Sequence, residues 1–160
     1  MVKLLCMDVD GTLTDGRVYI SPRGEELKAF DVKDGYGICH ILPKLGILPV
    51  VMTGRSSEAL VRRCTELGIT ELYQGVSDKV SCLDDLMSKM GVDWSQVAYI
   101  GDDLNDLECM ERVAASGGVV GCPMDACREV ATASNFVATR LGGRGAVREF
   151  IDWLYMSFNE

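Results

Sequence analysis

The sequence has few of the features that mark membrane, nucleic-acid-binding or metal-thiolate proteins. No apolar run reaches the roughly 18 residues that span a bilayer. The N-terminal run "MVKLLCMDVD" is too short for a signal peptide and has no small-residue cleavage site. Sixteen basic residues stand against 24 acidic ones, and the net charge of −8 argues against a nucleic-acid partner. The seven cysteines include no CxxC pair, which argues against a zinc site. We therefore expect a cytoplasmic protein with free, buried thiols and no membrane contact.

The chain is long enough for one self-supporting core. Its 160 residues predict a single domain, 1–160, and we find no internal repeat, low-complexity tract or linker. Apolar runs of strand length alternate with segments of helical pattern. The predicted strands are 3–9, 47–53, 71–75, 97–102, 117–122 and 135–139, and the predicted helices are 35–45, 57–67, 80–90, 104–113, 125–130 and 145–158. This alternation predicts an α/β fold, a Rossmann-like parallel sheet with helices on both faces.

One segment interrupts that alternation. Residues 17–33, "RVYISPRGEELKAFDVK", contain two short alternating stretches around the turn signal "SPRGE". They predict a β-hairpin inserted between the first strand and the first helix. The insertion is too small to be a domain, so we expect it to act as a flap in place of a cap domain.

Acidic residues follow the predicted strands at their carboxyl ends, where parallel sheets bind ligands. Asp8 and Asp10 follow the first strand, Thr53 ends the second, and Asp102 follows "VAYIG". Lys79 begins a helix after the third run. Each feature alone is weak, since DxD is common in turns and acidic residues favour helix N-termini. Together they predict one functional site, and crowded carboxylate oxygens favour Mg²⁺ over zinc.

These residues resemble the motifs of the haloacid dehalogenase superfamily of phosphohydrolases. The four motifs are "DVDGTLT" (8–14), Thr53, Lys79 and "GDDLND" (101–106). The flap resembles the minimal-cap branch of that superfamily. The stretches 24–38, 53–55, 72–79, 97–103 and 142–149 are similar to those of the 3-deoxy-D-manno-octulosonate 8-phosphate (Kdo 8-phosphate) phosphatases. The resemblance implies hydrolysis of this phosphomonoester, with Mg²⁺, during lipopolysaccharide precursor synthesis.

The resemblance also implies a role for each motif residue. Asp8 is expected to be the nucleophile that forms an aspartyl-phosphate, and Asp10 the general acid and then the base. The metal ligands implied are the side chains of Asp8 and Asp102 and the backbone carbonyl of Asp10. Thr53 and Lys79 are expected to bind the phosphate. An aspartate at position 10 favours a phosphatase over a dehalogenase, since a departing halide needs no proton.

Further residues are expected to bind the sugar acid, which carries a carboxylate as well as a phosphate. The octulosonate enzymes have Arg after "TG", as at Arg55, whereas a nine-carbon relative has Glu there. Arg55 therefore favours the eight-carbon substrate. The full set of predicted substrate-binding residues is Asp10, Asp31, Val32, Lys33, Asp34, Gly35, Arg55, Arg63 and Lys79.

Two other functions stay open at this point. One is a phosphatase for a nine-carbon 2-keto-3-deoxy sugar acid 9-phosphate. The other is a non-catalytic oligomerisation module, as in relatives fused to cytidylyltransferases, although that class predicts broken motifs. The resemblance further implies a homotetramer that assembles through the flap hairpins.

Overall fold

A six-stranded parallel sheet forms the centre of the molecule. The structure is a computed structural model and describes residues 1–158, without the side chains at positions 25 and 26. The strand order is β5-β4-β1-β6-β7-β8, the order of doubly wound dinucleotide-binding folds. The strands are β1 (Leu4–Met7), β4 (Leu48–Met52), β5 (Glu71–Tyr73), β6 (Val97–Ile100), β7 (Val119–Cys122) and β8 (Phe136–Val137). All six correspond to predicted strands, and each observed strand is shorter.

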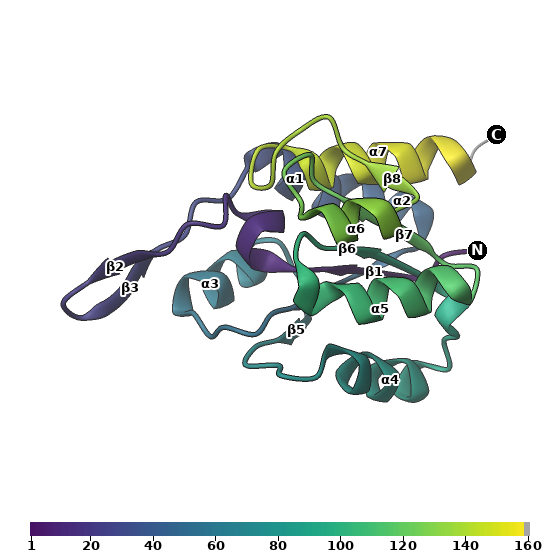
Figure 1. Ribbon diagram of the computed structural model, residues 1–160, viewed down its shortest axis with the longest axis horizontal. Coiled ribbons are helices and arrows are strands. Elements are labelled where there is room, and N and C mark those ends of the chain that lie inside the picture. The colour runs from purple at the N-terminus through teal and green to yellow at the C-terminus, as the bar shows by residue number, and fades with distance from the viewer. Residues whose placement is uncertain (159–160) are drawn as a thin grey trace.

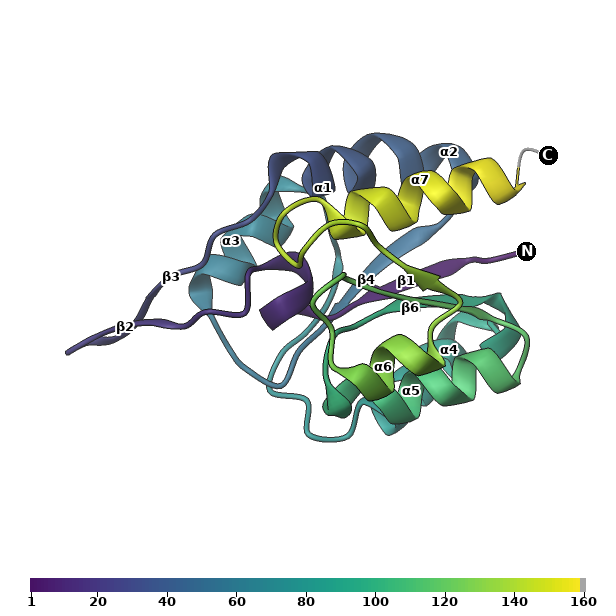
Figure 2. The ribbon, with the colours of Figure 1, turned by 45° about the horizontal axis from the view of Figure 1, so that its top comes forward.

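Helices cover both faces of the sheet (Figures 1 and 2). One face carries α1 (Val32–Tyr36), α2 (Leu42–Leu45), α3 (Glu58–Glu66) and α7 (Ala146–Phe158), and a single wide turn (Gly37–Ile41) joins α1 to α2. The other face carries α4 (Lys79–Met90), α5 (Leu104–Ala115) and α6 (Arg128–Ala133). The helix predicted at 125–130 begins three residues later, because the backbone of Cys127, its N-cap, is extended (φ −62°, ψ 156°). The predicted fold class is confirmed.

The alternating side chains of β1 divide the core into two layers. Leu5 and Met7 pack with α7, whereas Leu4 and Cys6 pack against α4 and α5. A strand buried on both faces has to be apolar throughout, which explains the continuous run "LLCM". All seven cysteines are free thiols, and four are buried as predicted, whereas Cys39, Cys82 and Cys127 are only half-buried. Within residues 1–158, no helix combines the length and the apolar composition needed to cross a membrane.

The predicted flap is a separate two-stranded antiparallel sheet. Strands β2 (Tyr19–Ser21) and β3 (Gly24–Leu27) form an arm that projects away from the main sheet (Figure 1). Its apolar side chains are largely in solvent, with Ile20 74% and Leu27 64% exposed. The arm leaves the body after β1 and returns to it just before α1, so its base lies beside the carboxyl end of the central strand.

Candidate active site

The site begins where β1 ends. Met7 is paired with Val51 of β4 and Ile100 of β6, and the Asp8 amide continues the ladder by donating to the Ile100 carbonyl (3.0 Å). The chain then turns sharply, because Gly11 has a φ of +97°, a value that side chains with a Cβ rarely adopt. The strand therefore places the buried Asp8 side chain at the carboxyl end of β1, where the strand order of the sheet reverses.

Lys79 links Asp8 to a second buried carboxylate. Its ammonium donates to Asp8 Oδ1 (2.6 Å) and to Asp106 Oδ1 (2.7 Å). Lys79 is the first residue of α4, and Asp78 caps that helix by accepting from the Ser81 amide (2.9 Å). Burial by itself would lower the pKa of the Lys79 ammonium, but the two adjacent carboxylates outweigh it and raise the pKa. Lys79 therefore stays protonated although its side chain is almost fully buried.

Asp106 has both carboxylate oxygens occupied by protein donors. Oδ1 accepts from Lys79 and from the Tyr99 hydroxyl (2.7 Å). Oδ2 accepts from the amides of Asp102 (3.2 Å) and Asp103 (3.5 Å). The residue is fully buried at the start of α5, where it forms a capping box with Asp103. Asp106 thus fixes the loop that carries Asp102 and the ammonium that contacts Asp8.

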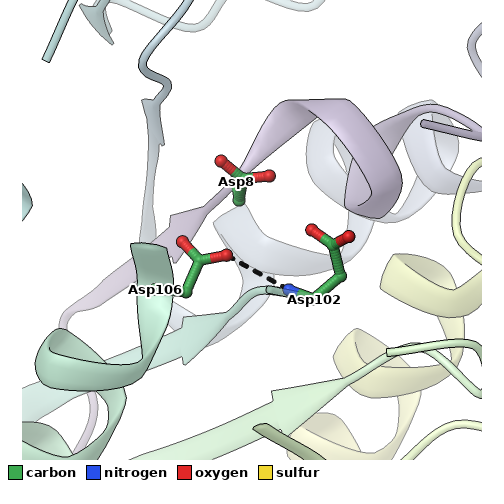
Figure 3. Close-up of side chains that lie close together, drawn as sticks. All are labelled: Asp8, Asp102 and Asp106. Atoms are coloured by element: carbon green, nitrogen blue, oxygen red, sulfur yellow. Dashed lines mark hydrogen bonds between the residues drawn. The ribbon is translucent and has the colours of Figure 1, made fainter. Parts of the chain in front are cut away.

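Asp102 completes an acidic cluster at this end of the sheet. Figure 3 shows the side chains of Asp8, Asp102 and Asp106 close together, and one oxygen from each lies within 4.8 Å of the others. Burial, followed by repulsion from Asp106, raises the pKa of Asp8 to about 6 despite the contact with Lys79. Burial, followed by repulsion from Asp8 and Asp106, raises the pKa of Asp102 to about 8. Three carboxylates with one lysine leave negative charge that a divalent cation would balance.

A glycine-rich loop near the C-terminus supports the turn after Asp8. The Gly143 amide donates to the Thr12 carbonyl (2.9 Å). A Cβ at Gly142 would lie 1.8 Å from the Gly11 carbonyl oxygen, and one at Gly11 would lie 2.0 Å from Asp102 Oδ2. Backbone therefore packs directly against backbone here, which explains "GG" at 142–143.

An open pocket of about 430 Å³ gives access to the cluster. Asp10 lies in it, and its carboxylate contacts two cations: Oδ1 lies 2.5 Å from Lys28 Nζ and Oδ2 lies 4.0 Å from Arg55 Nε. Thr53, at the end of β4, is buried and its Oγ1 accepts from the Arg55 amide (3.3 Å). The residues that line the pocket are Asp8, Asp10, Thr53, Gly54, Arg55, Asp103, Leu104 and Asn105.

The other predicted substrate-binding residues lie elsewhere. Asp31 caps α1 by accepting from the amides of Lys33 (2.7 Å) and Asp34 (3.4 Å). Val32 is 77% exposed, and Lys33 lines a separate surface groove with Arg140, Arg144 and Arg148.

Asp34, Gly35 and Arg63 form part of the packing between helices. Asp34 is buried and accepts from the Arg148 amide of α7 (2.7 Å). Arg63 closely approaches Gly35, because a Cβ on this glycine would lie 2.5 Å from Arg63 Nη2. The same Nη2 donates to the Asp31 carbonyl (3.4 Å). The structure thus brings Asp8, Asp10, Thr53, Arg55, Lys79 and Asp102 together at one end of the sheet.

Two residues of the site were missed or undervalued. Lys28 lies in the stretch 24–38, which is similar to the Kdo 8-phosphate phosphatases, but no periodicity distinguishes it from its neighbours in the flap. Asp106 forms a capping box at the start of α5, and its contact with Lys79 depends on α4 and α5 meeting. Asp106 is the last residue of the motif 101–106, but the motif does not show that its carboxylate contacts Lys79.

Comparison with known proteins gives matches to one group. Residues 63–137 match the model of the haloacid dehalogenase-like hydrolase family. The chain is 43% identical over 157 residues to a 3-deoxy-D-manno-octulosonate 8-phosphate phosphatase of Escherichia coli K12, covering 98% of this chain and 80% of that protein.

Solved structures agree with this match. A phosphatase of the same name from Moraxella catarrhalis, in complex with magnesium ion, phosphate ion and a KDO molecule, has a TM-score of 0.89 and 40% identity, covering 98% of this chain and 86% of that one. The Yersinia pestis phosphatase has a TM-score of 0.91 and 42% identity, covering 99% of this chain and 83% of that one.

Proposed function

The chain belongs to the 3-deoxy-D-manno-octulosonate 8-phosphate phosphatases of the haloacid dehalogenase-like hydrolases, and from this we propose that it hydrolyses Kdo 8-phosphate to Kdo and inorganic phosphate. The main support for the proposal is the buried cluster in which Lys79 contacts Asp8, with Asp102 nearby. This cluster opens into a pocket that is lined by Asp10. We assign the reaction to lipopolysaccharide precursor synthesis.

Asp8 is the proposed nucleophile. A carboxylate oxygen of Asp8 attacks phosphorus, the bond from phosphorus to the sugar oxygen breaks, and an aspartyl-phosphate forms. Lys79 contacts Oδ1, which leaves Oδ2 as the attacking atom. The ammonium also offsets the charge of the incoming phosphoryl group, and Thr53 donates its hydroxyl to a phosphoryl oxygen. The intact set of charged residues argues against a non-catalytic module.

Asp10 is the proposed proton carrier. In the first step it gives its proton to the departing sugar oxygen. In the second step it takes a proton from a water molecule, whose oxygen attacks phosphorus and breaks the bond to Asp8. Phosphate then leaves and the Asp8 carboxylate is restored. Asp10 suits both steps because it lines the open pocket beside Asp8 and its side chain is more exposed than that of Asp8.

The residues present fit a Mg²⁺ ion. We propose the Asp8 and Asp102 side chains and the Asp10 carbonyl as its protein ligands. Asp106 belongs to the same cluster but its two oxygens already accept four hydrogen bonds, so it positions the site without binding the ion. Bound there, the ion would polarise a phosphoryl oxygen as a Lewis acid.

Arg55 is the proposed contact for the sugar acid. It is half exposed at the rim of the pocket and close to Asp10, so its guanidinium can turn toward a carboxylate in the pocket. For Asp31, Val32, Lys33, Asp34, Gly35 and Arg63, contact with the substrate stays a prediction.

Phosphate release from Kdo 8-phosphate and from a nine-carbon sugar acid 9-phosphate, each with Mg²⁺, tests the proposal. We expect kcat/KM to favour Kdo 8-phosphate, and we expect a chelator to abolish activity until Mg²⁺ is restored. Arg55→Glu should shift the preference toward the nine-carbon compound, whereas Arg62→Glu, on the exposed side of α3, should not. A preference of the parent enzyme for the nine-carbon substrate would replace the proposed function with that alternative. Activity that survives chelation would refute the metal assignment.

Assembly and location are also proposed. The hairpin arm exposes Tyr19, Ile20 and Leu27, and an isolated two-stranded hairpin is marginal in water. We propose that the arms pair in a homotetramer in the cytoplasm, and sedimentation equilibrium would test the oligomeric state.

A further inference from the structure

We propose that Lys28, at the base of the hairpin arm, is a positioning residue that holds the Asp10 carboxylate in the orientation needed for proton transfer. This inference rests on the proposed function, in which Asp10 moves the protons. It adds a residue that lies outside the four motifs, and it implies that the arm contributes to the active site of its own subunit.

The first observation is the burial of the Lys28 side chain. Lys28 directly follows β3, in an arm whose other side chains are largely exposed, yet its side chain is 2% exposed. A lysine at such a place ordinarily keeps its ammonium in water. Burying it costs several kcal/mol unless a partner of opposite charge is in contact. Asp10 is such a partner, with Lys28 Nζ 2.5 Å from its Oδ1.

The second observation is that the two catalytic aspartates contact different lysines. Lys79 of α4 contacts Asp8, and Lys28 of the arm contacts Asp10. Asp10 lies in the turn after β1, where the backbone is neither strand nor helix, so a side-chain contact is needed to fix its carboxylate. With Oδ1 on Lys28, Oδ2, which lies 4.0 Å from Arg55 Nε, is the atom that exchanges protons with a substrate in the pocket.

The third observation is the position of Lys28 in the chain. The arm is an insertion between β1 and α1 (Figure 1). Lys28 directly follows β3, and its contact with Asp10 joins the base of the arm to the body. The position of the arm relative to the sheet therefore determines where the Lys28 ammonium lies. A misplaced proton donor about 1 Å from its productive position can cost about 100-fold in rate.

Four variants test the inference: Lys28→Met, Lys28→Arg, Asp10→Asn, and the double variant Lys28→Met/Asp10→Asn. With Kdo 8-phosphate, we expect Lys28→Met to lower kcat about 100-fold while KM changes less than about threefold. Lys28→Arg should recover activity to within about tenfold of the parent, because it retains a cation. In the Asp10→Asn background, Lys28→Met should change kcat less than about twofold, since the group it positions is gone. Lys44→Met, on the exposed face of α2, is the matched control.

A second substrate separates positioning from general damage. The p-nitrophenolate group leaves without needing a proton, so the burst of p-nitrophenol from p-nitrophenyl phosphate should fall less than about threefold in Lys28→Met. An equal loss on both substrates, or additive losses in the double variant, would overturn the inference. A raised KM with unchanged kcat would also overturn it, because Lys28 would then bind substrate directly.

Failure of the proposed function would be visible separately. It would show as a parent enzyme that does not hydrolyse Kdo 8-phosphate, and the Lys28 variants would then be compared on the alkyl phosphomonoester that it hydrolyses fastest. If Lys28→Met does not fold, Lys28→Gln, which still donates a hydrogen bond, replaces it in every comparison.

Discussion

Asp34 should make the protein less stable as the pH rises from about 4 to about 6. Its carboxylate is 2% exposed between α1 and α7; Oδ1 accepts from the Arg148 amide, and Oδ2 has no hydrogen-bond partner among the described residues. Burial raises the pKa of Asp34 to about 6, although the hydrogen bond from Arg148 opposes the shift. In the unfolded chain an aspartate has a pKa of about 3.9. The folded protein therefore binds a proton more tightly than the unfolded chain does.

The size of the effect follows from that difference. Between pH 4 and pH 6 the folded state holds the Asp34 proton and the unfolded state does not, so the free energy of unfolding falls as the pH rises. A pKa difference of about two units corresponds to about 3 kcal/mol of unfolding free energy. This stabilisation is lost as the pH rises through about 6. Asp34→Asn removes this term at every pH and keeps an oxygen that can accept from the Arg148 amide.

Urea denaturation of the parent and of Asp34→Asn, at fixed protein concentration and several pH values from 4 to 8, measures the effect. We expect the free energy of unfolding of the variant, minus that of the parent, to rise by about 3 kcal/mol between pH 4 and pH 7. The difference cancels the titration of the active-site carboxylates, which both proteins share. Asp85→Asn, which removes an exposed carboxylate from α4, is the control and should give a flat difference. A flat difference for Asp34→Asn would refute the reasoning.

Two further substitutions test the architecture of the site. Gly142→Ala should lower the free energy of unfolding by about 1–3 kcal/mol and reduce kcat, because the new Cβ would displace the Gly11 carbonyl. An unchanged melting temperature and unchanged activity would show that the two loops do not meet. Asp106→Asn should lower the free energy of unfolding by about 3 kcal/mol, because the amide cannot replace the charge beside Lys79 or accept all four hydrogen bonds. Urea denaturation measures this effect, and a loss below about 1 kcal/mol would contradict it.

The sheet and the core of the site could be predicted because each depends on a local pattern. Strands buried on both faces need unbroken apolar runs, so "LLCM" and "VAYI" are visible as strands without any knowledge of their partners. Residues directly after such runs must lie at the carboxyl edge of the sheet. That rule alone brings Asp8, Thr53 and Asp102 together, and the structure confirms their placement.

What could not be predicted are the contacts that depend on how separate elements approach one another. Lys28 contacts Asp10 across 18 residues because the arm returns to the body at that position, and nothing in the alternation of β2 and β3 encodes the return. The stretch 31–35 shows the opposite difficulty. Its similarity to a substrate-binding segment is clear in sequence. In the structure, however, the Asp34 carboxylate accepts a hydrogen bond from an amide at the start of α7, and the Asp31 carboxylate accepts one from an amide at the start of α1. A carboxylate near an active site can serve the substrate or a helix N-terminus with the same chemistry, and only the packing of α1 against α7 decides which amides it meets.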